Sequence, residues 1–103
     1  MTRTVTWDVT VWTDAPDDRA HIETVIAAFG AELDGVSDEG PWKATVLLGE
    51  VIPGDPHDSP KSAVNDLLAR RPRPALRVDA LQRALEERPG VQIGRVAVRA
   101  DLT

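Results

Sequence analysis

Within a predicted strand over residues 3–12, polar and apolar side chains alternate from Thr4 to Val11, and this pattern constrains the fold more than any other feature of the chain. A period of two places successive side chains on opposite faces of a strand. One face carries Val5, Trp7, Val9 and Val11, and the other carries Thr4, Thr6, Asp8, Thr10 and Trp12. The pattern predicts a strand with one buried face and one face in water, so a second layer must cover the apolar side.

The next segment has the spacing of an amphipathic helix that begins near Pro16. Its apolar stripe consists of Ile22, Val25, Ile26, Phe29 and Leu33. Asp14 is the expected N-cap, and proline suits the first helical turn. Gly30 and Gly35 interrupt the pattern, so a short strand over residues 33–37 is a second interpretation of the end of this segment.

Two further strands are predicted at residues 42–52 and 91–100. In the first of these, Val46, Leu47 and Leu48 are apolar on both parities, which predicts a central strand covered on both faces. In the second, the apolar parity changes at Gly94-Arg95. One extra residue there would return the later valines to the core, so we expect a β-bulge.

Two shorter helices are expected between these strands. Ser59 followed by Pro60 is typical of an N-cap and first helical position. Asp79 with Gln82 three residues later predicts the N-terminus of the second helix, and Gly90 is its expected C-terminal stop.

These elements predict one α+β domain over residues 1–103, organised as a two-layer sandwich. A mainly antiparallel sheet of three or four strands would carry two or three helices on one face. If residues 33–37 form a strand, the best-fitting topology is ferredoxin-like, with the first and third strands at the centre. Trp12 and Trp42 would then be neighbours at one end of the sheet.

Composition excludes several classes of protein. The 103 residues contain no cysteine, which excludes disulfide scaffolds, thiol catalysis and cysteine-bound metals. No apolar run reaches the roughly 18 residues of a transmembrane helix, and the N-terminal residues lack the apolar stretch of a secretory signal. No phosphate-binding glycine loop, nucleophile elbow or zinc-helix motif is present. We therefore expect a cytoplasmic protein without a cofactor. Ten of the twelve basic residues are arginine, a usage typical of GC-rich bacterial genomes.

Charge is distributed unevenly along the chain, although the net charge is only −5. Residues 1–60 carry three basic and twelve acidic side chains, whereas residues 61–103 carry nine basic and five acidic ones. This asymmetry favours steering of a partner or head-to-tail association, unless the two halves neutralise each other within one molecule.

The basic side chains gather in one cluster, made of Arg70, Arg71, Arg73 and Arg77. Forked guanidinium groups could bind a phosphate or an acidic protein surface, or pair with the acidic first half. Nucleic acid is disfavoured, because the whole chain is acidic and no aromatic residues are interleaved with these arginines. Arg95 and Arg99 on the last strand are expected to face Asp8 or Glu50 across the open face of the sheet.

Two groups of residues are candidates for a pocket or metal site. Asp17, Asp18 and His21 share the first turns of the predicted helix, where a carboxylate beside an imidazole could act as a general base. Asp55, His57 and Asp58 share a proline-rich loop and could donate to a metal. An exposed histidine in an acidic helix start and a plain surface turn are the simpler interpretations, and we expect no metal.

The tryptophans favour an interaction function. Trp12 falls on the threonine-rich face, where an aromatic ring at a strand end is typical of an interface, unless the ring packs against Trp42. The sequence therefore predicts a non-catalytic interaction or regulatory module, such as an adaptor, inhibitor or immunity-type protein, that binds a protein partner or itself through the sheet. The alternative is a small dimeric α+β enzyme or ligand binder, with a pocket between helices and sheet near His21, His57, Asp58 and Trp42.

Overall fold

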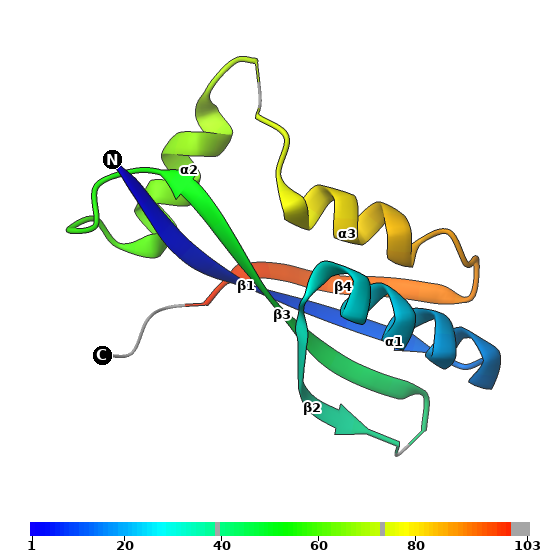
Figure 1. The fold of residues 1–103 in the computed structure, drawn as a ribbon. Helices are drawn as coiled ribbons and strands as arrows, with labels where there is room; N and C mark the ends of the chain where they lie inside the picture. The colour runs from blue at the N-terminus through cyan, green and yellow to red at the C-terminus, as the bar shows by residue number, and fades with distance from the viewer. Residues whose placement is uncertain (39, 73, 100–103) are drawn as a thin grey trace.

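The computed structural model describes residues 1–38, 40–72 and 74–99, and in this part of the chain it confirms an α+β sandwich (Figure 1). The elements follow one another as β1 (Thr2–Thr13), α1 (Pro16–Phe29), β2 (Glu32–Ser37), β3 (Trp42–Pro53), α2 (Pro60–Ala69), α3 (Arg77–Leu85) and β4 (Val91–Val98). The four strands form one antiparallel sheet in the order β2-β3-β1-β4. The first and third strands are central, as predicted; the ferredoxin-like description stays an interpretation of this order.

The long pairing of β1 with β3 fixes which side chains face the helices. Its register runs from Thr2 opposite Pro53 to Thr13 opposite Trp42. The alternation in both strands turns the odd-numbered side chains of β1 and the even-numbered ones of β3 toward the helices. The buried core combines these with one stripe from each helix, namely Ile22, Val25 and Ile26, Ala63, Val64 and Leu67, and Val78, Leu81 and Leu85.

The prediction that β3 is covered on both faces is wrong. Val46 and Leu48 are fully buried toward the helices, but Leu47 is only half-buried on the opposite face. All three helix stripes join the core on one side, so no second layer formed by the described residues covers the other face of the sheet.

Helix α1 begins and ends through contacts other than the predicted ones. Its N-cap residue is Ala15 rather than Asp14, and the Thr13 hydroxyl oxygen accepts the Ala15 N–H at 3.1 Å. The helix ends at Gly30, whose φ of 66° is the left-handed conformation that glycine adopts without strain. Leu33 therefore belongs to β2, which confirms the short strand predicted after the helix.

For the later helices, the predicted start is right for α2 and wrong for α3. The Ser59 hydroxyl accepts the Ser62 N–H at 3.1 Å and caps α2 as expected. Helix α3 starts two residues before the predicted cap Asp79, at Arg77, and ends at Leu85, well before Gly90. None of the helices in the described ranges combines the length and the apolar character needed to cross a bilayer.

The bulge in β4 lies where the parity change predicts it. Val9 pairs with Val96 and Val11 with Ile93, so Gly94 and Arg95 together face Thr10. The extra residue turns Val96 and Val98 to the helix side, opposite the buried side chains of β1. The strand ends at Val98, and the predicted end at residue 100 lies outside the described residues.

Candidate functional site

The helices pack on one side of the sheet and leave its other face open (Figure 1). A depression of about 540 Å³ lies on it, with Asp8, Thr10, Thr45, Arg95 and Arg99 in its lining. Thr10 and Thr45 are direct cross-strand partners in the two central strands. The hollow therefore presents hydroxyl groups at its floor and charged groups from β1 and β4 around them.

Arg99 organises the charges of this face. Its Nε lies 3.7 Å from Asp8 Oδ1, which confirms one of the two predicted pairings. Its Nη2 lies 2.9 Å from Asp34 Oδ2, so the side chain connects the β4 end of the sheet with the far strand β2. Arg95 also lines the depression and has no ion pair within the described part of the chain.

Trp12 lies on this open face, as its parity predicts. Its indole N–H donates to Gln92 Oε1 at 3.1 Å, and its ring covers Gly94 of the neighbouring strand. A Cβ atom at Gly94 would lie only 2.8 Å from the Cζ3 atom of the ring, so glycine is what allows this close packing.

Trp42 lies at the same end of the sheet as Trp12 but on the opposite face. It is buried on the helix side, with the Arg19 guanidinium carbon 5.4 Å from the centre of its ring. The two tryptophans are neighbours at one end of the sheet, as predicted, because Trp12 pairs with Lys43 and Thr13 with Trp42. Packing of one ring against the other is excluded, because the sheet separates them.

The arginines of the predicted cluster have different surroundings in the structure. Arg70 and Arg71 are exposed after the end of α2, and Arg73 lies outside the described residues. Arg77 instead donates to the Gly49 carbonyl at 2.8 Å and to the Phe29 carbonyl, the last residue of α1. Arg77 therefore connects three elements, which leaves Arg70 and Arg71 as the exposed candidates for an anionic ligand.

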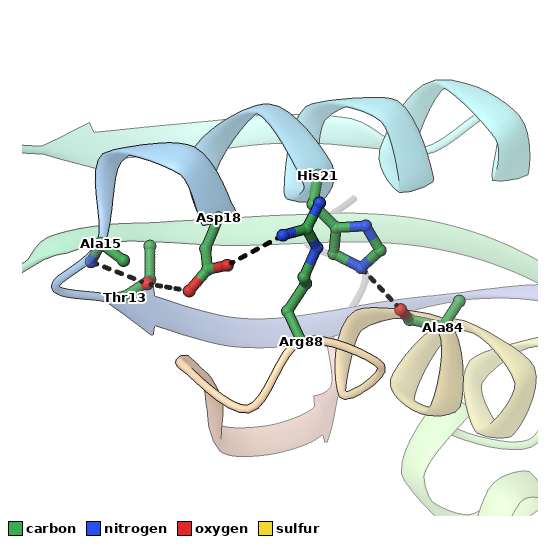
Figure 2. Close-up of polar contacts among 6 residues, drawn as sticks. All are labelled: Thr13, Ala15, Asp18, His21, Ala84 and Arg88. Atoms are coloured by element: carbon green, nitrogen blue, oxygen red, sulfur yellow. Dashed lines mark hydrogen bonds and ion pairs between the residues drawn. The ribbon is translucent and has the colours of Figure 1, made fainter.

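Asp18 and His21 lie at the seam between α1 and the α3–β4 segment (Figure 2). Asp18 is buried, accepts the Thr13 hydroxyl at 3.3 Å and lies 4.0 Å from Arg88 Nη1. His21 Nε2 lies 2.8 Å from the Ala84 carbonyl oxygen. The two side chains thus contact different parts of the opposing segment, while Asp17 faces solvent.

This seam also explains Gly90, the predicted helix stop. A Cβ atom there would lie 2.2 Å from Asp18 Oδ2, far inside contact distance. The residue is therefore a glycine that lets the buried carboxylate approach the backbone, and not the end of a helix.

Asp55, His57 and Asp58 form a turn after β3. Asp55 Oδ1 accepts the His57 N–H at 2.9 Å, and the Asp55 carbonyl accepts the Asp58 N–H at 3.0 Å. Arg3 of β1 donates to the Asp58 carbonyl and holds the turn to the sheet.

The two histidines lie far apart in the fold. The β3–α2 turn that carries His57 follows the Thr2–Pro53 end of the sheet, whereas α1, which carries His21, begins at the Thr13–Trp42 end (Figure 1). In the described ranges, no group of three or more histidine, aspartate or glutamate side chains could hold a metal ion.

Glu50 is the polar residue whose position the sequence analysis misjudged. It faces the helices rather than the open sheet, is only 5% exposed, and accepts the Trp7 indole N–H at 3.2 Å. It also accepts the backbone N–H groups of Arg77 at 2.8 Å and Val78 at 3.1 Å. A signal was present, since Glu50 shares its parity with Val46, Leu48 and Ile52.

Comparison with protein-family models, with curated proteins and with solved structures found no match to this chain. Its function must therefore be argued from the surfaces described above.

Proposed function

We propose that the chain is a small non-catalytic interaction module of the bacterial cytoplasm, of the adaptor, inhibitor or immunity type, which binds a protein partner or a second copy of itself through the open face of the sheet. The observation that carries this proposal is the uncovered face of a four-stranded sheet, with a polar depression at its centre and Trp12 at one end. A protein surface is the kind of partner that matches an area spread over several strands.

The composition of this face supports reversible binding. Its half-buried threonine hydroxyls and the partly exposed Asp8–Arg99 pair keep the face polar, so it needs no permanent cover. Trp12 supplies the type of aromatic side chain that dominates binding energy at protein interfaces. Trp7 and Trp42 are already buried, whereas Trp12 is only half-buried. A partner on the open face would therefore bury the part of the Trp12 side chain that is still exposed.

The contacts of the candidate catalytic residues also support a non-catalytic role. His21 contacts a backbone carbonyl and Asp18 is held by Thr13 and Arg88, while Asp55 stabilises its own turn. General acid–base chemistry needs such groups to converge on one substrate position, whereas Asp18 and His21 each contact their own structural partner and Asp55 lies in the turn after β3.

A bulky charge at the centre of the face tests the proposal. Thr45→Arg fills the depression, and Ala28→Arg on the exposed side of α1 is the matched control. Sedimentation equilibrium and affinity capture, with identification of the captured proteins, are compared for both. We expect Thr45→Arg to lose either self-association or a captured partner protein that Ala28→Arg retains. Identical masses and identical partners for both variants would exclude the open face as the binding surface.

A further inference from the structure

A second surface, on the helix side of the molecule, combines exposed apolar side chains with positive charge. A groove of about 310 Å³ lies between α2 and β4, with Val64, Leu68, Val96 and Val98 along it. Leu68 is 40% exposed and Val96 37% exposed, although both belong to the helix-facing side of the sandwich. Lys61 and Arg95 also line the groove, so the α2–β4 groove is apolar with a basic rim.

The groove lies beside an unpaired edge of the sheet. Strand β4 pairs with β1 on one side, and no strand of the described residues pairs with its other side. Outward-facing backbone groups of an edge strand are free to pair with a further strand. Any strand added there would place its helix-side residues directly over Leu68 and Val96.

The opposite edge of the sheet has the complementary character. Among the residues that the structure describes, strand β2 also pairs on one side only, and its six residues are all exposed. Leu33 and Val36 pair with Val46 and Ala44, so they belong to the helix side of the sheet. Glu32, in the same strand, pairs with Leu47, so it lies on the open-face side and makes that side of the edge acidic.

Strand directions allow the two edges to meet. Strand β2 is antiparallel to β3, which is antiparallel to β1, and β1 is antiparallel to β4. A second copy placed beside the first in the same orientation therefore brings its β2 antiparallel to β4, with both helix layers on the same side. An antiparallel pair of two β4 strands would instead bring two copies of the same basic edge together, with Arg95 of one copy near Arg95 or Arg99 of the other, which like-charge repulsion disfavours.

We propose that the α2–β4 groove binds the β2 edge of a second copy of the chain, with Leu33 and Val36 over Leu68 and Val96 on the helix side, and Glu32 beside Arg95 on the open-face side. This inference deepens the proposed interaction function, since it names a second copy as one partner and the sheet edges as the contact. The contact is heterologous, so it produces a growing row of copies rather than a closed dimer. Bulges in both edge strands reduce the number of backbone hydrogen bonds that the two copies could form with each other. The assembly is therefore weak and reversible.

The test is the solution mass of the full chain, measured by light scattering over a range of concentrations and salt. We expect the average mass to rise with concentration beyond that of a dimer, and to fall when salt is added. Leu68→Asp in the groove and Val36→Asp on β2 should each raise the Kd about tenfold or more, while Ala28→Asp on α1 should leave it unchanged. Circular dichroism confirms that the variants fold.

A charge exchange identifies the two edges as partners. Arg95→Glu and Glu32→Lys should each weaken association alone, and a mixture of the two variants should restore it. A protein that stays monomeric under all conditions would overturn the inference. Association that Thr45→Arg abolishes and Leu68→Asp does not would also overturn it, while supporting the open face as the binding surface; association insensitive to all these variants would overturn both proposals.

Discussion

A carboxylate buried on the helix side of a sheet needs donors for its oxygens, and Glu50 finds them in two elements. The Trp7 indole comes from β1, and the backbone N–H groups of Arg77 and Val78 come from the first turn of α3. These backbone donors have no partners within their own helix, and the positive end of the helix dipole lies at the same place. Glu50 therefore acts as the N-cap of a helix that begins 27 residues later in the chain.

Replacing Glu50 should destabilise the fold strongly. Glu50→Gln preserves the shape of the side chain but removes its charge. It also places an amide N–H₂ group where a carboxylate oxygen accepts N–H groups. Because buried donors to a charged group are then left unpaired, we expect a loss of about 2–3 kcal/mol in the free energy of unfolding. Urea denaturation measures it, with Glu23→Gln as the control: that carboxylate is exposed beside Arg19, and its loss should cost at most about 0.5 kcal/mol. Equal effects of the two substitutions would refute the capping role.

The packing of Trp12 on Gly94 gives a second prediction for single residues. Gly94→Ala places a methyl group 2.8 Å from the ring and must displace it. We expect a loss of about 1 kcal/mol in stability and a red shift of the emission, since Trp7 and Trp42 are buried and stay in place. Gly49→Ala is the control, because nothing lies within 4 Å of its Cβ position. In a Trp12→Ala background the cost of Gly94→Ala should vanish; a cost that persists would mean that the ring does not cause it.

Among the elements, strands were predicted better than helix ends, and the reason is the range of the determining contacts. The alternation in β1 and the parity change at Gly94-Arg95 are local patterns, and both the buried face and the bulge follow from them. The ends of α1 and α3 depend on Thr13 and Glu50, neither of which is the residue that local capping rules select. The open face with Trp12 was predictable from parity, whereas the α2–β4 groove depends on how α2 packs and has no local signature.

Arg77 connects the end of α1, strand β3 and the start of α3, so its loss should weaken the packing of these elements. Its guanidinium group donates to Phe29 and Gly49 carbonyls, and a cation is favourable at the C-terminus of a helix. Arg77→Ala should lower the stability by about 1–2 kcal/mol. Arg71→Ala, at an exposed site after α2, should change it by less than about 0.5 kcal/mol. Thermal unfolding of both variants measures the difference, and indistinguishable midpoints would show that Arg77 does not connect the elements.

At the scale of the whole molecule, part of the charge asymmetry is neutralised within the fold. Arg99 of the basic half contacts Asp8 and Asp34 of the acidic half, and Arg88 contacts Asp18. The Arg99 pairs are partly exposed to solvent, so they contribute little to stability, whereas the Arg88 pair involves the buried Asp18. Their effect is to leave the remaining charges at opposite edges of the sheet, acidic at β2 and basic near the α2–β4 groove.

The sheet order also predicts that the chain unfolds as one unit. Strand β1, at the N-terminus, lies between β3 and β4, so the first and last strands of the chain must pair before the sheet is complete. All three helices share the core that these strands form. Urea unfolding followed by far-ultraviolet circular dichroism and by tryptophan emission should therefore give coincident transitions, with a slope of about 1–3 kcal/mol per molar urea. Helix α2 is the element that would be expected to detach first if unfolding were not cooperative, because Ala63, Val64 and Leu67 are its only buried residues. An earlier loss of helical signal at constant emission would show that α2 detaches first, and the α2–β4 groove would then form only while that helix is in place.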